Sequence, residues 1–367
     1  MMVSVVFASA VKYAEVVLSS DRESAGKSDP RGGMYGVIRR SFARGGTAMA
    51  KMYAVLLLCL GIVMGAAMQS ASVVSASTEI FDTPPAVIAL IFVVLVLVAI
   101  FGGTKIIERI TEIVIPLSTL IYIILSLLVV FIYRSELPHT ISEIIHGAFD
   151  MSACAGGILG FMLSGPMKEG FSRGILSNEA GSGTSSLAHA RSGILNPAAA
   201  GLMGIIEVVF DTAFLCLLTA LAVLLPIDDV SAYTGGMQLV MSAFRLSLGS
   251  FSEKIVLFSV LSFAFATVIC WYFYFTEAYS WLFGDRAAHI TLPVFLGASF
   301  LGYLADGIIL VSLTDICLLG LTAINAITLI KSSDRIRFLS ERGGVIKLSD
   351  KALRSRLGVN RGSGSLR

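Results

Sequence analysis

The amino-acid sequence predicts an all-α polytopic membrane protein. Of its 367 residues, 56% are apolar and only 14% are charged, whereas a soluble domain usually has about a quarter charged residues. The charged residues are concentrated between long uncharged runs, which is the pattern of a chain that crosses a bilayer several times. These runs are too long for barrel strands and do not alternate apolar with polar residues. The net charge of +2 gives no bulk field that would attract a nucleic acid.

Nine apolar runs are candidates for crossings. A helix that crosses the hydrocarbon layer of about 30 Å needs about 20 largely apolar residues. The candidate runs are residues 1–20, 52–77, 85–101, 113–133, 144–164, 199–226, 253–283, 288–303 and 307–330. The stretch 234–250 is shorter than these runs and amphipathic, and we expect it to form a helix that lies along the membrane interface on the outer side rather than a crossing.

Lysine and arginine in the connections predict the orientation of these crossings. With the segment after residue 20 in the cytoplasm, 23 of the 27 basic residues fall on the inner side. The transmembrane domain then covers residues 1–331, and residues 332–367 form a basic cytoplasmic tail. Nine crossings place Met1 on the outer side, which predicts that one crossing is missing upstream of it.

Acidic residues inside the apolar runs are candidates for function, because each is costly in a bilayer unless it is paired or faces a cavity. Glu207 and Asp211 are four residues apart on one helix face. They either hold a cation or share a proton, or they pair with basic loop residues and helix N-termini. Glu15 is expected to form a local ion pair with Lys12, three residues before it.

Small residues mark a second candidate region in the run 144–164. Gly156 and Gly157 would let the helix unwind and expose backbone groups to a substrate, as in transporters with broken helices. Close packing of helices through small residues explains the same composition. Composition alone does not separate these two interpretations, and packing is the default.

Residues 171–192, FSRGILSNEAGSGTSSLAHARS, are too polar for a crossing and are predicted to form a loop. A phosphate-binding loop is disfavoured because the strand context and the lysine of such a site are absent. A Ser–His hydrolytic pair is also disfavoured, and the four histidines are scattered over connections on opposite sides. The sequence therefore predicts that this protein is not an enzyme.

The motif RGILSNEAGSGTSSLAHA, with the following NPAAAGLMGIIEVVFDTAFLCLLTALAVLL, resembles the alanine or glycine:cation symporter family, also called sodium:alanine symporters or amino acid carrier proteins. Further matching stretches occur in order along the chain to about residue 331: KYAEVVL, RGGMYG, MQSAS, FGGTKIIERITEIVIP, FAFATVICWYFYFTEAYSWLFG and LADG.

The resemblance implies the leucine-transporter-like fold of the APC superfamily, with a five-plus-five inverted repeat. The nine runs then correspond to helices two to ten, and the fold is truncated at the N-terminus by the first, gapped helix. It implies symport of alanine or glycine with sodium, or alternatively a proton, across the plasma membrane, with no other cofactor. Without the first helix, the alternative is a remnant that does not transport.

The resemblance also implies roles for individual residues. Gln69, Gly156, Gly157 and Trp271 match positions that line the amino-acid pocket. Thr267 matches one of two adjacent threonines whose hydroxyls resemble sodium ligands, and Ala266 occupies the other position. The signature that shapes the cytoplasmic side of the pathway is matched by five residues: Asn178, Glu179, Gly181, Asp211 and Thr212.

Overall fold

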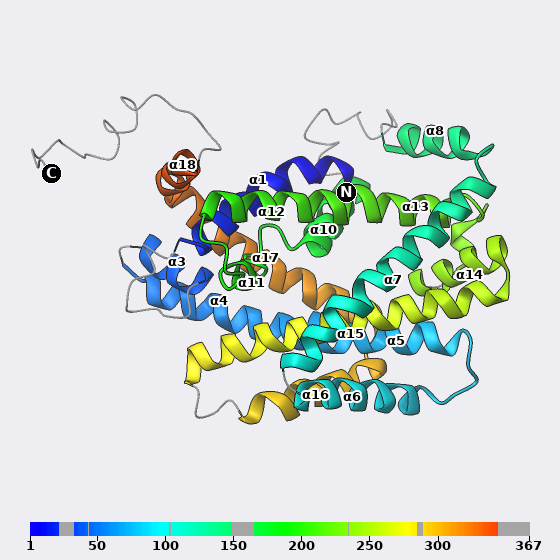
Figure 1. Cartoon of the computed structure of the whole chain (residues 1–367), viewed down its shortest axis with the longest axis horizontal. Helices are drawn as coiled ribbons and strands as arrows, with labels where there is room; N and C mark the ends of the chain where they lie inside the picture. Colours follow the sequence, from blue (N-terminus) through cyan, green and yellow to red (C-terminus); the bar gives the residue numbers. More distant parts are fainter. Residues whose placement is uncertain are drawn as a thin grey trace, which may run out of the picture. The chain divides into compact units, whose positions relative to one another are not determined.

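A computed structural model of the chain describes residues 1–21, 33–42, 44–102, 104–148, 165–233, 235–284 and 289–343. Within these ranges the regular secondary structure is helical and includes no strand (Figure 1). The predicted all-α class is therefore confirmed. Six helical segments are long and apolar enough to cross a membrane: Met2–Ser19, Gly46–Thr78, Glu112–Ile132, Pro197–Leu224, Ser250–Phe283 and Gly307–Lys331.

Two shorter apolar helical segments, Pro85–Phe101 and Thr291–Leu304, coincide with two more of the predicted runs. The remaining run, 144–164, overlaps the end of helix α8 (Leu137–Ala148), and its residues from 149 onward lie outside the described ranges. The count of nine crossings and the inverted repeat remain predictions.

The chain divides into two compact units. Unit 1 comprises Met1–Met2, Ala54–Gly174 and Phe210–Gly320, and unit 2 comprises Val3–Tyr53, Ile175–Val209 and Leu321–Arg367. The division falls within the helical segments α1 (Met2–Ser19), α4 (Gly46–Leu60), α10 (Gly165–Asn178), η3 (Val209–Cys216) and α17 (Gly307–Lys331).

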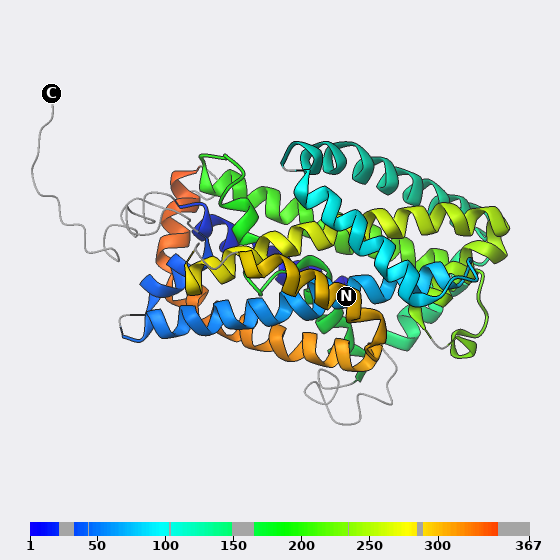
Figure 2. The same cartoon turned by 90° about the horizontal axis from the view of Figure 1, so that it is seen from below.

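Helix α15 (Ser250–Phe283) is the centre of unit 1 and packs against α7, α14, α5 and the π-helical segment η1 (Gly61–Met68). Figures 1 and 2 show these helices in two views. The other helical segments of this unit are α5 (Gln69–Thr78), α6 (Pro85–Phe101), α7 (Thr104–Ile132), α8 (Leu137–Ala148), η3 (Val209–Cys216) from Phe210 onward, α13 (Leu217–Leu224), η4 (Val230–Ala232), α14 (Gly236–Leu248), α16 (Thr291–Leu301) and η6 (Gly302–Leu304).

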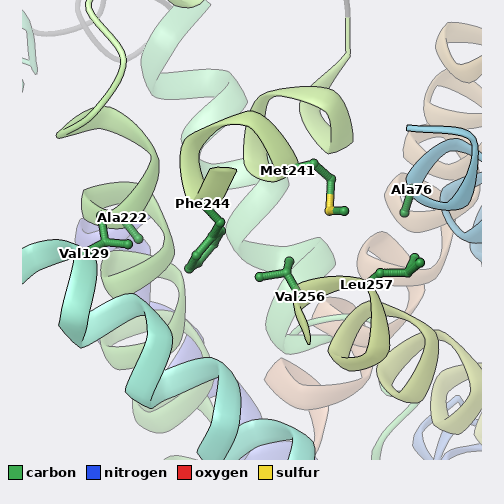
Figure 3. Packing of buried hydrophobic residues seen from close by; sticks show 7 residues of the cluster. All are labelled: Ala76, Val129, Ala222, Met241, Phe244, Val256 and Leu257. Atoms are coloured by element: carbon green, nitrogen blue, oxygen red, sulfur yellow. The ribbon is translucent and has the colours of Figure 1, made fainter. Parts of the chain in front are cut away.

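One apolar core of unit 1 lies where five of these helices meet. Figure 3 shows Met241 and Phe244 of α14 beside Val256 of α15. The cluster is completed by Ala76, Val129, Ala222 and Leu257. The predicted amphipathic helix in 234–250 is confirmed as α14, and two of its four buried residues, Met241 and Phe244, join this core. Its predicted place along the membrane surface stays a prediction.

The helix over 46–78 is continuous but changes its winding between α4 and α5. Residues Gly61–Met68 form the π-helical segment η1, a form of winding that is frequent at functional sites. A Cβ atom on Gly65 would overlap the side chain of Trp271, so only glycine allows η1 and α15 to approach this closely. The buried Trp271 ring is thereby fixed against η1.

In unit 2, helix α1 (Met2–Ser19) lies close to α12 (Pro197–Val208) because small residues face it. A Cβ on Gly201 would lie 2.7 Å from Val17, and a Cβ on Gly204 would lie 3.1 Å from Lys12. The other helices of unit 2 are α3 (Met34–Ser41), α11 (Ser186–His189) and α18 (Ser333–Arg342).

Helix α18 occupies the first part of the predicted tail. It packs against α12, and the Tyr13 hydroxyl of α1 donates a hydrogen bond to Ser340 Oγ at 2.8 Å. Arg335 forms an ion pair with Asp21 at 2.7 Å. Residues 333–342 are therefore a folded part of unit 2.

The predicted loop 171–192 is wrong in its first part. Residues up to Asn178 belong to helix α10, and the chain is irregular from Glu179 to Ser185. A polar helix is stable when its charges are paired. Arg173 forms ion pairs with Glu169 and Asp315, each at 3.1 Å, which explains why polar composition predicted the wrong structure here.

Two glycine substitutions test the packing of unit 1. A Cβ on Gly302 would overlap the backbone of Ala67, whereas a Cβ on Gly297 meets nothing within 4 Å. We expect Gly302→Ala to lower the stability of the protein by about 1–3 kcal/mol through overpacking. Gly297→Ala, inside α16, should be neutral or stabilising by up to about 1 kcal/mol. Thermal unfolding in detergent measures both, and equal Tm values for the two variants would contradict the packing described.

Candidate functional site

The most polar buried region of unit 2 is the loop from Asn178 to Thr184, which we call the signature loop. It follows α10 and turns through three residues with left-handed backbone: Glu179 (φ 53°), Gly181 (φ 98°) and Gly183 (φ 75°). Glycine is favoured at such positions because it has no Cβ. Two of the three left-handed positions in the loop are therefore occupied by the residue type that adopts this conformation most easily.

Hydrogen bonds within the signature loop stabilise this path. Asn178 Oδ1 accepts the Ala180 amide at 3.0 Å, and the Ser182 hydroxyl donates to the Glu179 carbonyl at 2.8 Å. The Thr184 hydroxyl donates to Glu179 Oε2 at 2.6 Å. The polar residues of the motif therefore satisfy one another and the adjacent backbone.

Helix α1 supplies two charged side chains that bind the loop backbone. Lys12 Nζ donates to the Asn178 carbonyl at 2.8 Å, and Glu15 Oε1 accepts the Gly181 amide at 2.8 Å. Both side chains are completely buried. A donor and an acceptor one turn apart on α1 therefore bind a carbonyl and an amide of the same loop.

Helices α4 and α17 supply two further side chains. The buried Tyr53 hydroxyl of α4 donates to the Ser182 carbonyl at 2.8 Å. Asn325 Nδ2 of α17 donates to the Gly181 carbonyl at 2.8 Å and also to Glu15 Oε1. We call Lys12, Glu15, Tyr53 and Asn325 the loop-binding residues. They come from three helices and contact the backbone of the loop rather than its side chains.

The predicted local ion pair between Lys12 and Glu15 is replaced by other partners. Lys12 Nζ lies 3.5 Å from Glu207 Oε2 of α12, and Glu15 binds Gly181 and Asn325. An i,i+3 pair is the usual solution on a solvated helix surface. Here the two side chains are buried against other elements, so contacts distant in sequence take its place.

The two acids on the 199–226 run differ in their surroundings. Glu207 contacts Lys12 and also His189 Nε2, which lies 3.0 Å from Glu207 Oε2. The alternative in which this acid pairs with basic residues is therefore the correct one for Glu207. Asp211 lies in η3 of unit 1, where its Oδ2 accepts the hydroxyl of the buried Thr212 at 3.4 Å.

Three of the residues predicted to bind substrate and cation, Gln69, Thr267 and Trp271, lie in unit 1 and are distant in sequence from the signature loop. Thr267 and Trp271 are one turn apart on α15, on the same face. Gln69 begins α5, against which α15 packs, and its Nε2 donates to the Met64 carbonyl at 3.3 Å. The structure thus brings their helices together, while Gly156 and Gly157 lie outside the described residues.

Sequence reasoning missed Tyr53 and Asn325 as loop-binding residues. A signal for Asn325 was present, because a carboxamide within an apolar run is costly unless another group pairs with it. Tyr53 gave no such signal, since tyrosine is common in apolar helices. Among the described residues, no group of three or more His, Cys, Asp or Glu side chains could hold a metal ion.

Helices long enough to cross a membrane, together with a buried polar loop, define a multi-pass membrane protein. Comparison with known proteins gives the family. The chain belongs to the Sodium:alanine symporter family, whose model matches residues 1–337. This membership confirms the resemblance noted in the sequence and agrees with the prediction that the protein is not an enzyme.

Individual relatives match at lower coverage. The uncharacterized transporter YflA of Bacillus subtilis is 30% identical over 336 residues, which are 91% of this chain and 71% of YflA. The uncharacterized transporter YaaJ of Escherichia coli is 33% identical over 62% of this chain and 48% of YaaJ. The sodium/alanine symporter AgcS of Methanococcus maripaludis is 26% identical over 83% of this chain and 68% of AgcS. The chain thus spans about half to about 70% of these relatives.

Removal of the Lys12 ammonium tests the importance of the loop contacts. Lys12→Met removes the ammonium that donates to the buried Asn178 carbonyl, and we expect a loss of about 1–3 kcal/mol of stability. Glu207→Gln alone should cost less, about 0–1 kcal/mol, because this side chain is 47% exposed. The double variant should lose less stability than the sum of the two single losses, since both changes remove the same contact between Lys12 and Glu207.

Chemical or thermal unfolding in detergent provides this measurement, with Lys254→Met as the control. Lys254 is an exposed lysine on an apolar helix, so its replacement should change stability by no more than about 0.5 kcal/mol. Equal effects of Lys12→Met and Lys254→Met would mean that the buried contacts of Lys12 contribute nothing.

Proposed function

We propose that this protein is a secondary active symporter that moves a small neutral amino acid, alanine or glycine, together with sodium. The observation that carries the proposal is the family match over residues 1–337. We place the protein in the plasma membrane with its C-terminus in the cytoplasm, on the distribution of lysine and arginine. Transport would proceed by alternating exposure of a midplane site within the leucine-transporter-like repeat.

Trp271 supports the choice of a small substrate. Its side chain is 1% exposed and is fixed by the close approach to Gly65 and by an edge-to-face contact with Tyr274, with ring centroids 5.5 Å apart. A fixed indole provides an apolar wall that does not move aside for a larger side chain. The name of the relative AgcS, sodium/alanine symporter, agrees with this substrate class.

Thr267 supports a cation site near the same wall. It is half-buried and one turn before Trp271, so a sodium ion on its hydroxyl would bind close to an amino acid on the indole. Binding of one would then raise the affinity for the other, which is the thermodynamic basis of coupling. Ala266 removes one hydroxyl from the family pattern, so backbone carbonyls would supply the remaining ligands.

Uptake into proteoliposomes tests the proposal. Purified protein of residues 1–367 should accumulate radiolabelled alanine or glycine when an inward sodium gradient is imposed, and should not do so with potassium in its place. Accumulation driven equally well by a proton gradient without sodium would identify the proton as the coupling ion. No accumulation under either gradient, with folded protein, would contradict transport by this chain.

A substitution of Trp271 tests its place in the pocket. Trp271→Phe should raise the KM for alanine by about tenfold, equivalent to about 1.4 kcal/mol of lost binding. The control is Trp281→Phe, the same change ten residues further along α15, which should leave uptake unaltered. If Trp271→Phe is folded and its KM is unchanged, Trp271 does not line the pocket.

A further inference from the structure

Several buried side-chain oxygen atoms in unit 2 have no hydrogen-bond partner among the described residues, and two of these atoms belong to side chains that contact each other. These two atoms are Glu15 Oε2 and Asn325 Oδ1, and both side chains are completely buried. The Gly183 amide also acts on the Glu15 carboxyl, without forming a hydrogen bond to Oε2. Buried polar atoms without partners are rare and need an explanation.

These two atoms belong to side chains that already contact each other. Asn325 Nδ2 donates to Glu15 Oε1 and to the Gly181 carbonyl. A flipped amide would place Oδ1 against both of these acceptors, so the orientation is determined by the contacts. What remains is one acceptor atom on each of the two side chains that has no hydrogen-bond partner among the described residues.

The complete burial of Glu15 favours an added proton, and the Lys12 ammonium acts in the opposite direction. Glu15 binds the signature loop, Glu179 belongs to it and Glu207 contacts Lys12, so three carboxyl groups share one nearby ammonium. Lys12 contacts Glu207 directly, and Glu207 has His189 as a second partner. Glu207 is half-exposed and can remain ionised, whereas an ionised and incompletely bonded Glu15 would be costly.

We propose that Glu15 and Asn325 together bind one proton. The proton resides on Glu15 Oε2 and is donated to Asn325 Oδ1, while Asn325 Nδ2 donates to Glu15 Oε1. The acid and the amide then form a ring of two hydrogen bonds, and the proton comes from solvent with no other bond made or broken. One proton satisfies both unpartnered atoms and removes the buried charge.

This proton would stabilise the signature loop. Gly181 donates its amide to Glu15 and gives its carbonyl to Asn325, so both of its backbone groups are bound by the protonated pair. Other titratable or charged groups face the pair or its neighbours from the surrounding elements: Lys12 on α1, Tyr53 on α4, Glu179 on the loop, His189 on α11 and Glu207 on α12.

A sodium ion is the competing occupant of the same two oxygens. It would lie near the Lys12 ammonium, which already acts on Glu15, and two cations beside one carboxylate repel each other. A proton avoids this repulsion because it neutralises the carboxyl. The charges therefore favour the proton, and sodium becomes an outcome of the test.

Infrared spectroscopy of the carboxyl groups tests the proposal. The full chain in lipid nanodiscs, at neutral pH in sodium-free buffer, should show a carbonyl stretching band of a protonated carboxylic acid. Glu15→Gln should remove this band, and the matched control Glu207→Gln should retain it. If Glu15→Gln instead removes an ionised-carboxylate band and leaves the protonated band unaltered, the proposal is wrong.

Two further arms complete the experiment. Asn325→Leu should shift the band of the protonated carboxylic acid, because both hydrogen bonds of the ring are lost. This variant takes the place of Glu15→Gln if Glu15→Gln does not fold. An unshifted band in Asn325→Leu would overturn the proposal. Addition of sodium chloride should leave the band in place, whereas its replacement by a carboxylate band would identify sodium as the occupant. No amino acid is present, so the result is independent of whether the protein transports.

Discussion

The signature loop between α10 and α11 contains backbone amides and carbonyls that no regular helix pairs. Inside a membrane protein each unsatisfied group of this kind costs several kcal/mol, because little water is available to replace the missing partner. The loop-binding residues Lys12, Glu15, Tyr53 and Asn325 supply these partners. The charged residues Lys12 and Glu15, in the C-terminal half of the apolar helix α1, are thereby explained by the loop that they bind.

Several features of unit 2 follow from this constraint. Gly201 and Gly204 let α12 approach α1, which brings Glu207 to the Lys12 ammonium. The SNEAGSG sequence combines residues for left-handed backbone with side chains that bond the loop internally. The motif that identifies the family is thus accounted for by the conformation of the loop, while the residues proposed to contact substrate and sodium lie on α5 and α15 of unit 1.

The fold class and most helices could be predicted because apolar length is a direct requirement of a bilayer. The motif could be recognised, but its structure could not, since paired charges such as Arg173 with Asp315 allow a polar helix where composition predicts a loop. The partners of Lys12 and Glu15 could not be predicted either, because local spacing favours an i,i+3 pair. The actual partners are more than 160 residues away in the sequence. Pairings between distant segments depend on packing that periodicity does not reveal.

Hydrogen–deuterium exchange of the signature loop tests the central claim most directly. In nanodiscs the amides of residues 178–184 should exchange slowly, like those of the neighbouring helices. Tyr53→Phe, which removes only the hydroxyl bound to the Ser182 carbonyl, should accelerate their exchange by about tenfold, equivalent to about 1.4 kcal/mol, and leave α15 unaltered. Rapid exchange in the unmodified protein, as in a solvated loop, would contradict the account.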